Sequence, residues 1–143
     1  MKLSPFAQAY RQNSVQTASP GQLILMLFDG ALHFMNRALL GFTHEDVIPR
    51  NEAVHTNLLK TQAIIDELQA CLRHEVGGEF AGTMSALYDY MRVQLREANR
   101  YKVAAPVHIV MDLLGDIRAP WAAMLTQAAT QDSRPIGMVA TAA

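Results

Sequence analysis

Four stretches of this chain repeat apolar side chains every three or four residues, and none alternates convincingly between apolar and polar residues. Spacings of three and four place side chains on one face of an α-helix, whereas a strand requires a period of two. The 143 residues are about the length of one ordinary domain. The pattern therefore predicts a single all-α domain.

Start and stop signals bound the predicted helices. Ser19 can cap the first helix, Pro20 fits its first turn, and Gly41 is a suitable stop. Prolines near the starts of the second and fourth helices and a Gly-Gly pair before the third mark the other boundaries. The expected helices span about residues 19–40, 46–74, 79–101 and 106–128. Short connections favour antiparallel neighbours, so we expect an up-down-up-down four-helix bundle.

The two ends of the chain lack this strong periodicity. Residues 1–18 are predicted to form an N-terminal arm that lies on the bundle, and residues 129–143 a flexible tail. The bundle itself is then predicted to comprise residues 19–128.

Three of the helices have a well-defined apolar face. We assign these faces to the core, because such stripes usually face the interior of a bundle. They consist of Val54, Leu58, Ile65, Leu68 and Leu72; of Phe80, Met84, Leu87, Met91, Leu95 and Ala98; and of Val107, Val110, Leu114, Ile117, Trp121 and Leu125.

Apolar residues beyond these core faces suggest a binding surface. The apolar arc of the first helix covers roughly 200° of its circumference, which is more than a bundle buries. A smaller second stripe lies on the third helix. The residues that we select as contacts for a partner are Ile24, Leu25, Phe28, Leu32, Tyr90 and Val93.

Two interpretations of this surplus remain open. The N-terminal arm or a homodimer contact could cover it, or it could form a groove for an amphipathic or extended segment of another protein. The two interpretations are compatible if the N-terminal arm occupies the groove until a partner displaces it. A structural homodimeric bundle with a different client is the alternative function, and a small-molecule or metal-binding bundle is a third class.

The histidines and carboxylates of the sequence do not have the spacing that a catalytic or metal site in a helical bundle would require. No two histidines are three or four residues apart, and the single Glu-x-x-His pair, Glu52 and His55, places Glu52 opposite the core face. A bundle di-metal site needs two such pairs and two further carboxylates. We therefore predict no enzyme activity, no catalytic residue, no metal and no cofactor.

Charge and composition narrow the partners and the compartment. A net charge of −1 provides no basic field for nucleic acid or for anionic membranes. The longest apolar run, residues 23–28, is too short to span a membrane, and the N-terminus lacks the pattern of a secretory signal. The single cysteine, Cys71, suits a reducing compartment. We expect a soluble cytoplasmic protein that binds neither nucleic acid nor membranes.

Several short runs resemble the FliS flagellin chaperones, and they occur in that family's order over about residues 10–125. The most specific is Thr-Ala-Ser-Pro-Gly-Gln-Leu at 17–23, followed by Leu-Phe-Asp-Gly-Ala-Leu at 27–32. The others are Tyr10 with Asn13, Gly77-Gly78-Glu79, Leu87-Tyr88-Asp89-Tyr90-Met91, Ala98-Asn99, and Arg118 with Trp121.

The resemblance implies a function. FliS-type proteins are antiparallel helical bundles that bind the C-terminal segment of newly made flagellin in the cytoplasm, prevent its early polymerisation and escort it to the flagellar export gate. They hold their client without ATP. In the family the N-terminal arm is implicated in gate docking, and Tyr10 and Asn13 are the matching anchor residues here.

The chain departs from the family at two positions. Phe28 stands where a tyrosine is common, which removes a hydroxyl but keeps the packing. Pro120, directly before Trp121, is unexpected inside a helix. Since proline lacks an N–H and clashes with the preceding turn, we expect it to kink the fourth helix or to end it early.

Overall fold

The computed structural model describes residues 19–75 and 78–132. Those residues form four α-helices and no strand, which confirms the all-α class. The helices are α2 (Pro20–Gly41), α3 (Val47–Glu75), α4 (Gly78–Tyr101) and α5 (Ala105–Asp132). The predicted arm and the end of the predicted tail lie outside the described residues.

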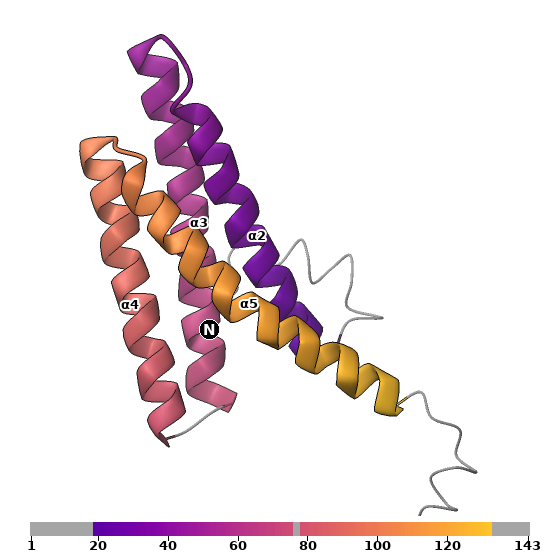
Figure 1. Ribbon diagram of the computed structural model, residues 1–143. Helices are drawn as coiled ribbons and strands as arrows, with labels where there is room; N and C mark the ends of the chain where they lie inside the picture. The colour runs from indigo at the N-terminus through magenta and orange to yellow at the C-terminus, as the bar shows by residue number, and fades with distance from the viewer. Residues whose placement is uncertain (1–18, 76–77, 133–143) are drawn as a thin grey trace, which may run out of the picture.

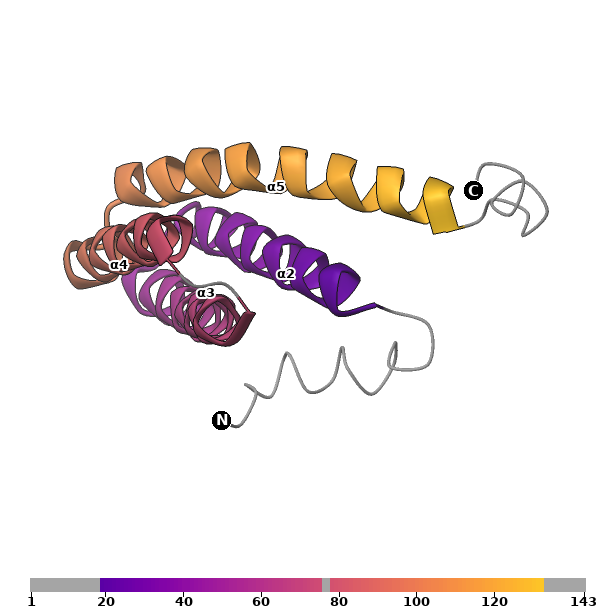
Figure 2. The same ribbon diagram turned by 90° about the horizontal axis from the view of Figure 1, so that it is seen from below.

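The four helices form an antiparallel bundle in which each helix packs against two neighbours (Figure 1). Helix α2 packs on α3 and α5, and α4 packs on the same two helices, whereas α2 and α4 lie at opposite corners and do not pack on each other. In the view from below, α3 and α4 lie side by side and α5 crosses over α2 and α4 (Figure 2).

Helix α2 begins as its sequence predicts. The Ser19 hydroxyl accepts a hydrogen bond of 3.1 Å from the backbone N–H of Gln22, and Pro20 occupies the first helical turn. At the other end, Gly41 lies so close to α3 that a Cβ atom on it would be 2.9 Å from that of Ala53. A glycine there allows the two helices to approach each other closely.

The core lies where the four helices converge. Its fully buried large side chains include Met35 from α2, Leu58 and Ile65 from α3, Met91 and Leu95 from α4, and Val107, Val110 and Leu114 from α5. Two predictions for α4 are wrong: Phe80 is 60 % exposed and Leu87 is only half-buried, whereas Tyr88 is buried. The buried face of α4 is thus turned toward Tyr88.

A row of polar side chains joins α3 to α4. Arg92 is bonded to Asp66 at 2.7 Å and to Asp89 at 2.8 Å, and it also donates to Gln69. Gln69, which is buried, donates in turn to Asp89 at 3.1 Å. These bonds satisfy polar groups at the edge of the core and fix the register of the two helices.

Helix α5 differs from the expected form. It continues through Pro120 to Asp132, instead of ending early or near residue 128. Proline removes one N–H donor, but Pro120 is an exposed residue at the pocket. The packing of Trp121 and Leu125 beside Gly21 holds the turn that follows against α2, which offsets the missing bond.

Candidate functional site

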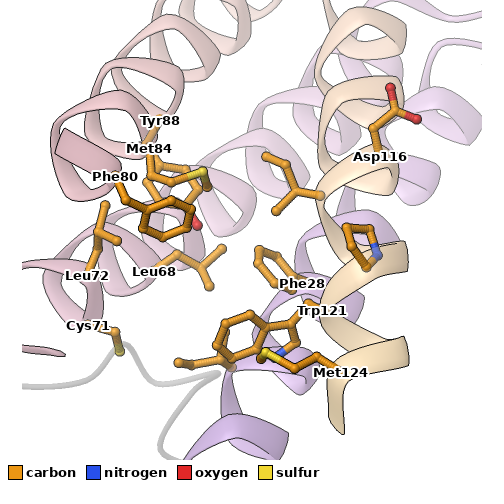
Figure 3. A pocket seen from close by; sticks show the side chains of 13 residues that line it. Phe28, Leu68, Cys71, Leu72, Phe80, Met84, Tyr88, Asp116, Trp121 and Met124 are labelled. Carbon is orange, nitrogen blue, oxygen red and sulfur yellow. The ribbon is translucent and has the colours of Figure 1, made fainter. Parts of the chain in front are cut away.

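An apolar pocket opens at the end of the bundle where α2 begins and α3 ends. Its volume is about 440 Å³ (Figure 3), which is within the usual range of ligand pockets. The lining residues are Ile24 and Phe28 from α2; Leu68, Cys71 and Leu72 from α3; Phe80, Met84 and Tyr88 from α4; and Asp116, Ile117, Pro120, Trp121 and Met124 from α5.

The pocket exists because α4 and α5 diverge. A short turn joins them at one end of the bundle, and they move apart toward the other (Figure 1). The consequence is visible along α5: Val110 and Leu114 are buried, but Ile117 and Trp121, further from the turn, are only partly so. Apolar stripes thus continue past the point where the helices are close enough to fill the space between them.

The pocket is almost free of charge. Asp116 is its only ionisable carboxylate, and Figure 3 shows that carboxylate pointing away from the apolar side chains. Phe80 and Met124 are 60 % and 49 % exposed, so the pocket is accessible from solvent. Such a surface can bind apolar groups.

Several contacts attach the second half of α5 to α2 beside the pocket. The indole N–H of Trp121 donates to the backbone carbonyl of Gly21 at 3.0 Å, and the Trp121 ring meets Phe28 edge to face at 6.4 Å. One turn earlier, Arg118 pairs with Asp29 at 2.5 Å. The hydrogen bond and the charge of Asp29 raise the pKa of Arg118 above its ordinary value. These contacts fix two walls of the pocket.

Tyr88 forms part of the pocket floor. It is buried, and burial, with a smaller contribution from nearby Cys71, raises the pKa of its hydroxyl from 10.0 to about 12. The hydroxyl is neutral at physiological pH, as an ordinary tyrosine hydroxyl is, so Tyr88 adds no charge to the floor.

The residues selected from the sequence are distributed over different surfaces. Ile24 and Phe28 line the pocket. Leu25 and Leu32 are partly buried against the core, and they follow the side of α2 on which Gly21 and Asp29 meet α5.

The two residues selected on α4 lie elsewhere. Tyr90 and Val93 are 45 % and 49 % exposed and do not line the pocket. Because α2 and α4 are at opposite corners, the two sets do not form one continuous surface. Tyr10 and Asn13 lie outside the described residues.

Most of the pocket was not predicted from the sequence, because its lining residues were assigned to the core. Leu68, Leu72, Met84, Ile117 and Trp121 all belong to the predicted core faces. The available signal was their position: they cluster toward the same end of the bundle. Whether the helices converge there depends on the angle of α5, which periodicity does not specify.

Two further features of the described residues concern metal ions and membranes. Within residues 19–75 and 78–132, no three His, Cys, Asp or Glu side chains are grouped to hold a metal ion. Helix α2 is long and apolar enough, by length and composition alone, to cross a membrane. A core helix satisfies the same criterion, and eight residues of α2 are buried in this bundle.

Comparison with known proteins gives consistent matches over most of the chain. A family model described as "Flagellar protein FliS" matches residues 3–128. The flagellar secretion chaperone FliS of Salmonella typhimurium is 41 % identical over 133 residues, which is 92 % of this chain and 96 % of that protein. Its counterpart in Bacillus subtilis is 39 % identical over 113 residues, which is 79 % of this chain and 80 % of that protein.

Proposed function

This chain belongs to the FliS family of flagellar secretion chaperones, and from that premise we propose that it binds the C-terminal segment of flagellin. In this proposal it acts in the cytoplasm, prevents premature polymerisation of flagellin and escorts it to the flagellar export gate, without ATP and without catalysis. The observation that carries the proposal is the open, predominantly apolar pocket at the divergent end of the bundle.

The pocket suits an amphipathic segment of a polymerising protein. Such a segment has apolar side chains that are unburied until assembly, and each large one gains ~1.5–3 kcal/mol when fully buried. Ile24, Phe28, Trp121 and Met124 supply apolar walls for them. Most of this gain is offset by the cost of ordering the client, which leaves an affinity that permits release.

A client that wraps around the bundle would also reach the part of α4 outside the pocket. Tyr90 and Val93 provide an exposed apolar stripe there, and we include them as a second contact, with Leu25 and Leu32 as the adjoining edge on α2. Tyr10 and Asn13 are proposed to anchor the N-terminal arm and to take part in docking at the gate, on the basis of the family resemblance.

Titration calorimetry with a peptide from the C-terminal end of flagellin from the same organism tests the proposal. We expect one-to-one binding with a negative change in heat capacity, because apolar surface is buried. A folded wild-type protein that binds no such peptide would contradict the proposal.

Charged substitutions in the pocket locate the site. Phe80→Asp and Met124→Asp alter side chains that are already exposed, so the fold should survive, but each places a charge where the client buries apolar groups. We expect each to raise Kd about tenfold or more. Ile48→Asp is the matched control, because Ile48 is 72 % exposed at the start of α3, far from the pocket, and should leave Kd unchanged. Val93→Asp tests the second contact in the same way.

A further inference from the structure

The pocket has one wall that leads directly into residues of unassigned function. Trp121 and Met124 lie on α5, which continues to Asp132 and projects past the rest of the bundle (Figure 2). Residues 133–143 follow. Their attachment to α5, which supplies Trp121 and Met124 to the pocket, makes them candidates to occupy it.

The composition of residues 133–143 matches the lining. After Arg134 there is no ionisable side chain, and Ile136, Met138 and Val139 are the large apolar ones. Side chains from this part of the segment, 135–143, can enter an apolar pocket without the cost of burying a charged side chain. The unbranched, flexible side chain of methionine is suited to filling irregular apolar space.

The covalent connection is long enough. Trp121 is eleven residues before the end of α5, or roughly 16 Å along a helix that rises 1.5 Å per residue. Met138 and Val139 follow Asp132 by six and seven residues, so an extended chain can bring them back about 20–25 Å. That distance reaches Met124, Trp121 and the pocket beyond them.

We propose that residues 133–143 bind in the apolar pocket of their own molecule when no client is present, with Met138 and Val139 as the buried side chains. The consequence for client binding rests on the function proposed above. Because the segment is tethered, its effective concentration is in the millimolar range, and weak contacts suffice to occupy the pocket. The client must then displace it, which lowers the client's apparent affinity.

Two unique side chains allow a test that needs no client. Cys71 is the only cysteine and Trp121 the only tryptophan of the chain, and both line the pocket. The full-length protein carrying Met138→Ser and Val139→Ser is compared with wild type for the alkylation rate of Cys71 by N-ethylmaleimide and for quenching of Trp121 fluorescence by acrylamide. We expect both to increase about threefold or more, as the pocket opens.

Two controls make the comparison specific. Ala142→Ser with Ala143→Ser makes the same kind of uncharged change in the same segment, and should behave as wild type. A synthetic peptide of residues 133–143, added to the Met138→Ser, Val139→Ser variant, should restore the protection of Cys71. Equal melting temperatures of the variants establish that the fold is unchanged.

The proposal would be overturned if the Met138→Ser, Val139→Ser variant showed the wild-type alkylation rate of Cys71 and the wild-type quenching of Trp121. A second variant, Leu3→Ser with Phe6→Ser, tests the segment before Pro20. The proposal would also be overturned if only this variant increased Cys71 alkylation and Trp121 quenching, because the segment before Pro20 would then be the occupant. Neither readout depends on flagellin. The proposal can therefore fail while flagellin binding holds, and flagellin binding can fail while this protection is observed.

Discussion

At the scale of single residues, the close approach of α2 and α3 depends on the absence of one side chain. A Cβ on Gly41 would lie 2.9 Å from the Cβ of Ala53 and 3.2 Å from the backbone nitrogen of Val54. The backbone on that side cannot give way as the tip of a flexible side chain would. Gly82, within α4, has no atom within 4 Å of the equivalent position.

We predict that Gly41→Ala destabilises the protein and that Gly82→Ala does not. Overpacking at Gly41 should cost about 1–3 kcal/mol in the free energy of unfolding. At Gly82 the higher helix propensity of alanine should instead stabilise by about 0.5–1 kcal/mol. Urea denaturation of both variants measures the two effects, and equal changes at the two sites would contradict the prediction.

The buried Tyr88 makes the stability of the protein depend on pH, and the direction of that dependence follows from its raised pKa. Its pKa is raised from 10.0 to about 12 in the folded protein. Its contribution to stability is therefore complete below pH 10 and is lost as the pH rises to 12, because the unfolded chain releases the proton first. The loss should amount to about 2–3 kcal/mol.

We expect Tyr88→Phe to remove this part of the alkaline loss. The measurement is the free energy of unfolding of wild type and variant at several pH values between 9 and about 12.5. The difference between the two proteins isolates Tyr88 from the other groups that titrate there. If both proteins lose stability in parallel over this range, the burial of Tyr88 has no such effect.

At the scale of the helices, local signals were sufficient to find the elements. The Ser19 cap is present as expected, and Gly78 has a left-handed backbone, with φ of 80°, where the glycine pair predicted a turn. The exception is α5, which the proline rule alone would have kinked or ended early. Contacts of Trp121 and Leu125 with α2 override that rule, and such tertiary contacts cannot be read from local sequence.

Replacement of Pro120 by alanine should therefore stabilise α5. The substitution restores an N–H that can donate to the carbonyl of Asp116, and it should raise the free energy of unfolding by about 1–3 kcal/mol. Thermal denaturation provides the measurement. Pro120→Ser restores the same N–H and should gain slightly less, since serine has a lower helix propensity. No gain in either variant would mean that the helix has already compensated for proline.

The candidate binding site was less predictable than the helices, because it too depends on tertiary packing. Ile24 and Phe28 were selected because the apolar arc of α2 is too wide, and both line the pocket. Phe80 and Met84 were assigned to the core because their stripe is continuous with Met91 and Leu95. Periodicity identifies an apolar face, but the angle between helices decides whether that face is filled or open.

At the scale of the whole molecule, the two ends of the bundle differ in packing. On α4 the buried residues Met91, Leu95 and Ala98 lie in the half nearer to the turn with α5, and the fourth, Tyr88, lies near the middle of the helix. No residue of the first two and a half turns, 78–86, is buried. Local opening costs least where few apolar contacts are broken, so the pocket end should open more readily.

Amide hydrogen exchange should show this difference directly. We predict that the amides at 82–87 on α4 exchange faster than those at 91–98, although both sets lie within one helix. Binding of the client should slow the first set more than the second, since it supplies the missing contacts. Uniform protection along α4 in the free protein would contradict this.

The open end of the bundle also limits which substitutions the sequence can accept. The stripes that line the pocket are those that build the core, so larger or better-fitting side chains at Met84 or Ile117 would close the gap and increase stability. The same changes would remove the space available to a client. Selection for stability and selection for binding thus act in opposite directions on the same positions. A protein of this kind must remain less stable than its own composition would allow.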